Sequence, residues 1–232
     1  MKKLTIKQIQ KIFRRNNLDK NFCIELSRLL ELYKDTFKIN TPIRRVRFLA
    51  QAVHEVGVKR SGKIRLRESL NYSPKGLMDI SLYFRLHPKL AYKYARTKSH
   101  RADQKAIANI MYDDKNRSKR LKLGNKWGDD GYKFRGMFMF QTTGRYNATK
   151  DIAHITKMTG IVIINPETKQ PYKGILDTHT IFIIGGMAHW HRTKMYKLKS
   201  TNAITNKINK GLPKKKKKQR LLTAIRLKEY IS

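Results

Sequence analysis

The sequence predicts a mainly α-helical protein. Three observations indicate this class: apolar residues recur at helical intervals in several segments, convincing strand patterns are few, and 40% of the 232 residues are hydrophobic, which is enough for a sizeable core. There is no internal repeat. We therefore expect a single domain over residues 1–232, large enough to form two lobes around a cleft.

The N-terminal part of the chain predicts three amphipathic helices. Thr5 and Gln8 have the spacing of a capping box at the start of the first helix, and residues 22–37 carry the second helical pattern. Pro42 stands where a first helical turn tolerates proline, and the apolar stripe that follows it ends near Gly57. This third helix contains a His-Glu pair.

Loops and helices alternate in the rest of the chain. A basic, irregular stretch over residues 61–72 precedes a further helical run, and residues 113–136, rich in Gly, Asp and Lys, predict a long functional loop. A shorter loop over residues 165–174 precedes residues 177–192, which are apolar enough for a central buried helix with closely packed glycines. The lysine run at residues 214–218 predicts a solvated charged turn. Apolar residues at helical spacing follow it: Leu221, Leu222 and Ile225.

The chain is strongly basic. It has 53 Lys and Arg residues against 16 Asp and Glu residues, so its formal net charge is +37 and its pI is near 10.5. A charge of this size draws a protein to polyanions or anionic surfaces. It does not choose between nucleic acid and the anionic polymers of a cell envelope, and we do not predict a dedicated nucleic-acid partner.

The cysteine content and the lengths of the apolar runs bear on disulfides, secretion and membrane insertion. Cys23 is the only cysteine, which rules out an intramolecular disulfide and a zinc site with several thiolates, and we expect it to be buried. The first residues are basic but lack the apolar run of a secretion signal, and no stretch approaches the roughly 20 apolar residues of a membrane span. We expect a soluble protein made in the cytoplasm.

Two glutamates are candidate catalytic residues. On the predicted helix Glu55 points toward a second, half-buried surface near Phe48 and Val56, where loss of hydration favours a protonated carboxyl group. Glu68 has two arginines beside it in sequence, and their charges favour the ionised form. Hydrolysis of a glycosidic bond needs this combination, because one carboxyl protonates the leaving oxygen and the other activates water.

The alternative is that both glutamates are ordinary charges paired with some of the many cations. A metal site is not predicted, because Val58 stands where a helical zinc-protease motif needs its second histidine. His189 and His191, two residues apart, do not share a helix face. We expect them and His179 to be packing or surface residues.

Four stretches carry a family resemblance. They are RRVRFLAQAVHEVG, ESLNYSPKGL, GDDGYKFRGMFMFQTTGRYN, and ITNKINKGL followed by QRLLTAI. In order and spacing, over roughly residues 5 to 230, they resemble motifs of glycoside hydrolase family 19, the family of plant-type chitinases and many phage endolysins. The resemblance implies a lysozyme-like, two-lobed helical domain with a central substrate cleft and no metal or organic cofactor.

The resemblance also implies residue roles. Glu55 matches the family's general acid, and Glu68 matches its second carboxylate, the general base of an inverting displacement. Gln141 and Thr143 match residues that help hold the substrate and the nucleophilic water. Asn147 and Asn209 match amide residues of the sugar-binding cleft, and Arg220 matches a basic residue that supports the second carboxylate. The alternative is turn capping for the two asparagines and a solvated surface charge for the arginine.

Some positions depart from the family pattern, and some aromatic residues lie outside it. Met137 and Phe138 follow Arg135 and Gly136 where the family has R-G-R-G, so a bulky residue replaces a glycine and reshapes the predicted cleft floor. Val56 replaces the serine after the first glutamate, and Lys210 replaces the first glycine of a pair. Aromatic residues that can stack on sugar rings, or pack in the core or loops, are Tyr72, Trp127 and Tyr132.

These observations together predict an inverting glycosidase, with carboxyl groups about 6.5 to 9.5 Å apart, that cuts β-1,4 bonds of bacterial peptidoglycan. The lack of disulfide cysteines and of a secretion signal, with the high positive charge, favours this substrate over chitin and describes a phage endolysin. It is expected to act as a monomer on glycan strands and anionic envelope polymers. From the host cytoplasm it needs a membrane-permeabilising partner to reach the cell wall.

Two alternatives remain open. One is a chitinase that acts on N-acetylglucosamine polymers. The other is a basic, non-catalytic protein with a glycosidase fold that binds nucleic acid or envelope polymer.

Overall fold

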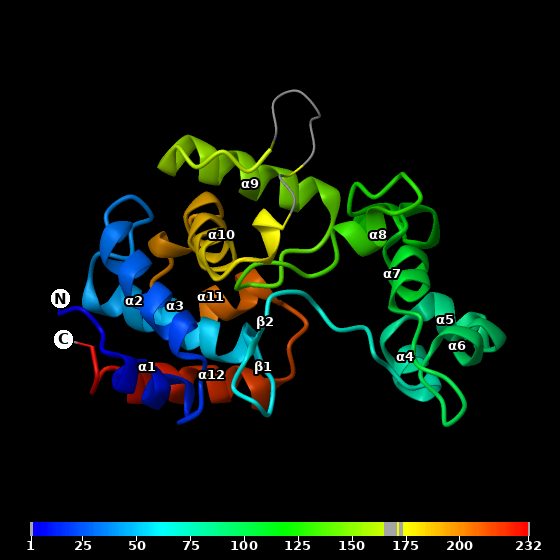
Figure 1. Cartoon of the computed structure of the whole chain (residues 1–232), viewed down its shortest axis with the longest axis horizontal. Helices are drawn as coiled ribbons and strands as arrows, with labels where there is room; N and C mark the ends of the chain where they lie inside the picture. The colour runs from blue at the N-terminus through cyan, green and yellow to red at the C-terminus, as the bar shows by residue number, and fades with distance from the viewer. Residues whose placement is uncertain (1, 165–170, 172–173, 232) are drawn as a thin grey trace. The chain divides into compact units, whose positions relative to one another are not determined.

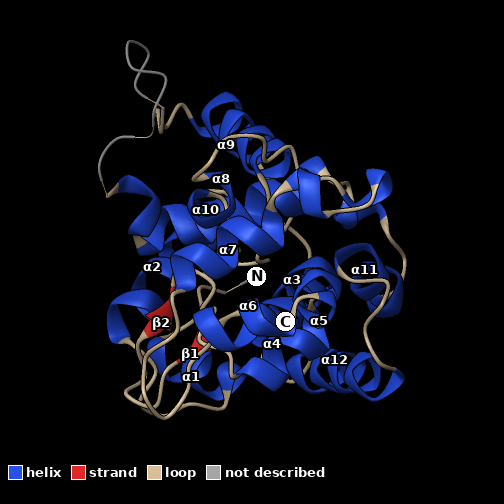
Figure 2. Cartoon of the chain, turned by 90° about the vertical axis from the view of Figure 1, so that its right-hand side faces the viewer, coloured by secondary structure: helices blue, strands red, loops and turns tan. Residues whose placement is uncertain are grey.

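The computed structural model of the chain describes residues 2–164, 171 and 174–231. Within these residues the chain forms twelve α-helices and one two-stranded sheet, which confirms the mainly α class (Figure 1, Figure 2). The chain divides into two compact units. The first unit contains Met1–Leu66, Phe138–Gln141 and Asp151–Ser232, and the second contains Arg67–Met137 and Thr142–Lys150.

The first unit contains the N-terminal helices, a short hairpin and the C-terminal helices. Their bounds are α1 Ile6–Phe13, α2 Lys20–Leu32, α3 Pro42–Glu55, β1 Gly57–Val58, β2 Ile64–Arg65, α10 His179–Arg192, α11 Thr201–Ile208 and α12 Lys214–Leu227, with single 3-10 turns at Ile175–Asp177 and Met195–Lys197. Helix α3 packs against α12 and α11, and α10 packs against α2. The rings of Phe48, Phe140 and Trp190 meet in its core.

The second unit is built from short helices. Their bounds are α4 Pro74–Ile80, α5 Leu82–Leu86, α6 Pro88–Tyr94, α7 Gln104–Tyr112 and α8 Asp130–Lys133, with 3-10 turns at Asp114–Asn116 and Lys119–Leu121. Helix α9, Arg145–Thr159, begins in this unit and ends in the first. The core of the second unit is a separate apolar cluster centred on Leu70, Leu77, Phe84, Ile107 and Ala108.

The three predicted N-terminal helices are confirmed, as is the capping box of the first, although α2 ends at Leu32 and not near residue 37. Thr5 and Gln8 form the capping box of α1, and Thr41 caps α3 directly before Pro42. Strands β1 and β2 pair antiparallel next to α3, partly within a stretch predicted to be irregular. Strands of two residues are too short to show a sequence period, which explains why the hairpin was not predicted.

The predicted loop over residues 113–136 is more ordered than expected, because its acidic residues bind backbone N–H groups. The carboxylate of Asp114 accepts hydrogen bonds from the N–H groups of Leu123 and Gly124, at 2.6 and 3.0 Å. Asp130 likewise accepts from the N–H groups of Lys126 and Trp127. These bonds fix two 3-10 turns and the one-turn helix α8 within the segment.

Helix α10 is buried, as predicted, and its glycines permit close packing. A Cβ on Gly185 would lie 2.3 Å from Cγ of Phe138, and one on Gly186 would lie 2.5 Å from Cβ of Met139. Phe138 itself has a φ of 61°, a left-handed conformation that favours glycine. The bulky residue at this family glycine position is therefore accommodated by a missing side chain on the facing helix.

Helix α12 differs from the prediction in two ways. The lysine run forms its first turns instead of a turn before it. The residues predicted to form its apolar face are largely exposed, with Leu222 at 52% and Ile225 at 54% exposure. Its buried face carries Arg220, Ala224 and Leu227 instead, because the helix orients a charged residue toward α3.

Three other sequence expectations have simple outcomes. Cys23 is buried, as expected. The predicted loop at residues 165–174 lies outside the described residues except for Pro171 and Gly174. Among the helices that the structure describes, none is long and apolar enough to cross a membrane.

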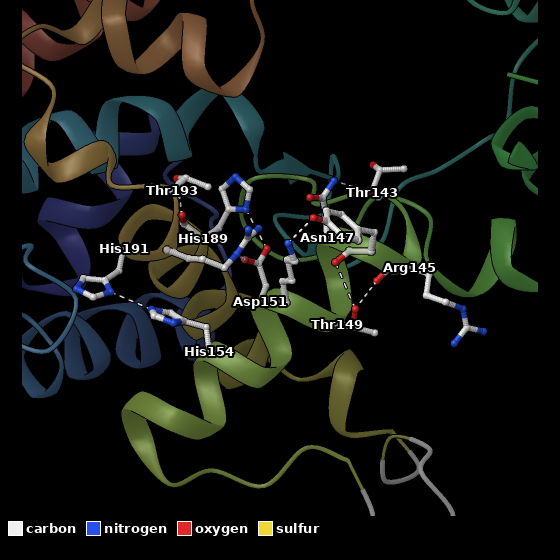
Figure 3. A network of polar contacts seen from close by, with 12 residues as sticks. Thr143, Arg145, Asn147, Thr149, Asp151, His154, His189, His191 and Thr193 are labelled. Carbon is white, nitrogen blue, oxygen red and sulfur yellow. Dashed lines mark hydrogen bonds and ion pairs between the residues drawn. The ribbon is translucent and has the colours of Figure 1, made fainter. Parts of the chain in front are cut away.

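A polar network joins α9 and α10 within the first unit (Figure 3). Asp151 is fully buried and accepts hydrogen bonds from Nδ1 of His189 at 2.9 Å and Nε of Arg192 at 2.5 Å. Burial would raise the pKa of Asp151, but these partners hold it below its usual value. Next to it, Nε2 of His154 and Nδ1 of His191 share a hydrogen bond of 2.9 Å with stacked rings. Of the histidines predicted to be packing or surface residues, His189 and His191 thus form specific polar contacts, whereas His179 packs edge-on against Phe22.

This histidine pair makes the stability of the fold depend on pH. Burial lowers the pKa of both His154 and His191 below 6.5, and a nearby positive charge adds to this at each. The unfolded chain then binds more protons than the folded one near and just below pH 6.5, so the free energy of unfolding falls on acidification through this window. We expect denaturant titrations to show this fall, and His154→Gln to reduce it.

His100→Gln, at an exposed histidine outside the network, is the matched control. A pH dependence that is equal in His154→Gln and His100→Gln contradicts this account of the pair.

Candidate active site

Glu55, the first candidate catalytic residue, is the last residue of α3. Its Oε1 accepts a hydrogen bond of 2.5 Å from Nη2 of Arg220, and its side chain keeps 16% exposure. A carboxylate at a helix C-terminus is opposed by the helix dipole, and the arginine offsets this. The prediction placed only apolar groups around Glu55, and the structure corrects it, because a buried guanidinium faces the carboxylate.

The arginine that binds Glu55 is held by a buried network. Nη1 of Arg220 donates to Oε1 of Gln51 at 2.8 Å, and Nε2 of Gln51 donates to Oγ1 of Thr205 at 3.0 Å. The Thr205 hydroxyl donates in turn to the carbonyl of Thr201 at 2.9 Å. Each of these polar groups is satisfied, so the network fixes the guanidinium. Arg220 was matched to a group that supports the second carboxylate; here it supports the first.

Glu68, the second candidate, lies in an extended segment of the second unit. Its N–H donates to the carbonyl of Gly136 at 2.8 Å, and the N–H of Gly136 donates back to its Oε2 at 3.2 Å. The Tyr112 hydroxyl lies 2.9 and 2.8 Å from the two carboxyl oxygens. Arg135 donates to the Glu68 carbonyl at 3.3 Å. Two donors, Tyr112 and Gly136, therefore fix the carboxyl group, and Arg135 holds the main chain of the same residue.

The direction of the pKa shift predicted for Glu68 is wrong. Burial raises the pKa of Glu68, and the hydrogen bonds from Tyr112 and Gly136 and the charge of Arg135 only partly oppose this. The prediction used the arginines next to Glu68 in sequence, whereas desolvation by the surrounding fold is the larger effect. The raised pKa of Glu68 is closer to neutral pH, and general acid or base catalysis is most effective when the pKa of the catalytic group is near the working pH.

A pocket of about 500 Å³ opens beside Glu68 within the second unit. Its wall includes Tyr72, a candidate sugar-stacking residue, and Tyr112, the hydrogen-bond partner of Glu68. Tyr83 and Arg117 also line it. Tyr72 is half-buried, packs partly against the apolar cluster and lines the pocket. Glu68 is therefore placed to contact a molecule that binds in this pocket.

The other predicted residues make mostly local contacts. Gln141 is half-buried with a φ of 51°, and its N–H donates to the carbonyl of Phe138 at 3.1 Å. Asn147 donates through Nδ2 to the carbonyl of Thr143 at 3.3 Å, one helical turn earlier (Figure 3). Asn209 is exposed and is the C-cap residue of α11. Each asparagine thus lies at a helix end, Asn147 in the first turn of α9 and Asn209 at the C-terminus of α11.

Trp127 is 63% exposed, but one face of its indole ring is covered. The guanidinium of Arg145 lies 4.4 Å from the ring centroid and also binds the buried Asp130. A sugar ring therefore has access only to the opposite face. In a similar way Arg135 covers Tyr132, at 3.9 Å from the ring centroid.

Two supporting residues were missed as site residues from the sequence. Gln51 lies one helical turn before Glu55 on the same helix face, and a buried amide in an apolar pattern is a signal that could have identified it. Tyr112 lies 44 residues after Glu68, and nothing in the sequence links the two. Among the described residues no group of three or more His, Cys, Asp or Glu side chains is placed to hold a metal ion.

The fold and these groups define a mainly helical protein with two glutamates, each held by specific polar partners. No family model matches the chain. A curated relative from Haemophilus influenzae, named glycosyl hydrolase family 19 domain-containing protein, is 33% identical over 165 residues, which cover 71% of this chain and 70% of the relative. The chain belongs to glycosyl hydrolase family 19. This membership indicates a glycoside hydrolase of the chitinase and lysozyme type.

Proposed function

We propose that the protein is a peptidoglycan-degrading glycosidase that hydrolyses β-1,4 glycosidic bonds with inversion. The observation that carries the proposal is the setting of Glu68, a half-buried carboxyl group held by Tyr112 and Gly136 at the wall of a 500 Å³ pocket. In a family 19 chain, this supports Glu68 as the base that activates water. Glu55, held by Arg220, is proposed as the acid that protonates the leaving oxygen because it matches the family's general acid; the surroundings of the two carboxyl groups do not by themselves assign the two roles.

The charge of the chain favours peptidoglycan over chitin. A net charge of +37 attracts the protein to bacterial envelopes, whose peptidoglycan and associated polymers carry carboxylates and phosphates. Chitin is a neutral polymer and gains nothing from this field. We further propose that the protein acts as a phage endolysin, a monomer that leaves the host cytoplasm when a partner permeabilises the membrane.

Product analysis tests the proposed substrate. Purified sacculi and N-acetylglucosamine oligomers are incubated with the protein, and mass spectrometry identifies the reducing ends that are released. We expect faster cleavage of sacculi, with reducing sugars as new ends. Preferential cleavage of the oligomers would establish the chitinase alternative, and tight polyanion binding with no cleavage of either would establish a binding protein.

Tyr112 is predicted to set the pH range in which Glu68 acts as a base. The Tyr112→Phe substitution removes the hydroxyl that donates to the carboxylate, so the pKa of Glu68 should rise further. The acid limb of the kcat/KM profile on sacculi should then move to higher pH by about one unit. Tyr83→Phe, at another pocket tyrosine, is the matched control. An unchanged acid limb in Tyr112→Phe contradicts the assignment.

A further inference from the structure

The pocket beside Glu68 contains a fixed cation. Arg117 lies on its wall, in the segment after the first 3-10 turn. Its Nε donates to the carbonyl of Leu121 at 2.8 Å, and its Nη1 donates to the carbonyl of Met111 at 3.2 Å. Two backbone carbonyls therefore orient the guanidinium, and they leave its charge uncompensated by any acidic group among these contacts.

The rest of the lining is nearly neutral. Glu68 is the only acidic residue of the pocket wall, and the other polar members are hydroxyl and amide groups, such as Ser81, Asn116 and Ser118. A substrate carboxylate in this pocket would be repelled by an ionised Glu68 unless a cation were present to bind it. A neutral glycan needs no such cation. The guanidinium is suited to a carboxylate because it presents planar donors in a fixed direction.

We propose that Arg117 binds a carboxylate of the substrate, so that the pocket selects carboxylate-bearing glycans over neutral ones. The inference rests on the proposed function and deepens it, since peptidoglycan differs from chitin by such groups. Two sources offer the same chemistry: the lactyl carboxylate of muramic acid, free when the stem peptide is removed, and the carboxylates of the stem peptide itself. Arg117 is thus a specificity-determining residue.

Binding measurements on an inactive background test this directly. In the Glu55→Gln protein, isothermal titration calorimetry at about 0.15 M salt compares glycan oligomers that carry stem peptides, oligomers stripped of their peptides, and N-acetylglucosamine oligomers of equal length. Arg117→Gln is expected to weaken binding of at least one carboxylate-bearing oligomer about tenfold to a hundredfold and to leave the neutral oligomer unchanged. Loss only with stripped oligomers identifies the lactyl group, and loss only with peptide-bearing oligomers identifies the stem.

Two controls separate this effect from others. Lys115→Gln removes the same charge from an exposed neighbour outside the pocket wall and should leave all three affinities unchanged. Arg117→Lys keeps the charge and should retain part of the selectivity. Equal weakening for neutral and charged oligomers, or no weakening, overturns the inference. Failure of the wild-type protein to cleave sacculi would instead overturn the proposed function. The binding measurements do not depend on cleavage, so the two failures can be told apart.

Discussion

Glu55→Gln is expected to lower turnover on sacculi by at least about 100-fold and to leave the protein folded. The amide has the shape of the carboxyl group and still accepts a hydrogen bond from Arg220, but it has no proton to give to the leaving oxygen. Release of reducing ends measures turnover, and thermal unfolding measures the fold. Glu25→Gln, at a glutamate that also pairs with an arginine, is the matched control and should keep full activity.

The roles of the two glutamates are separated by the leaving group. An aryl glycoside with an acidic phenol needs no proton donor, so Glu55→Gln should recover much of its activity on it, whereas Glu68→Gln should stay inactive because water is not activated. The opposite pattern would reverse the two roles. Loss of the fold in Glu55→Gln would show that Glu55 is structural.

Arg220→Met is expected to cause the largest loss of stability among the site variants. The substitution leaves Glu55 and the buried Gln51 without their guanidinium partner, and removal of one member of a largely buried ion pair costs on the order of 3 kcal/mol. Urea unfolding measures the change. Activity should fall as well, because the carboxyl group loses the donor that orients it.

Lys218→Met is the control for this substitution. Lys218 is exposed on the same helix, so its replacement by the same residue should change the free energy of unfolding little. If Arg220→Met is as stable as Lys218→Met, the buried network does not hold α12 against α3.

The helices were predictable where a local signal specifies them. Caps and apolar periods identify α1 and α3, because both are set by residues three or four apart. The apolar pattern did not predict which face of α12 is buried, because tertiary packing determines it. Helix α12 buries Arg220 and exposes Leu222, since contacts with the polar network on α3 outweigh the local pattern. The order of residues 113–136 depends on carboxylates that bind distant N–H groups, which no period reveals.

The polar surroundings of the two candidate glutamates were not predictable from the sequence. Glu55 and Glu68 follow from their motifs, and the structure gives each a set of polar partners. Their surroundings were inferred from neighbours in sequence, whereas the partners that matter come from far along the chain: Arg220 for Glu55, and Tyr112 for Glu68. Protonation depends on burial and on such contacts, so sequence neighbours alone are a poor guide to it.

The anomeric form of the first product tests the central claim most directly. Proton NMR follows soluble peptidoglycan oligomers during hydrolysis, before the free sugars equilibrate. Direct attack of water activated by one carboxylate, while the other protonates the leaving oxygen, inverts the β-bond and yields the α-anomer first. Early accumulation of the β-anomer would contradict the two-carboxylate inverting mechanism.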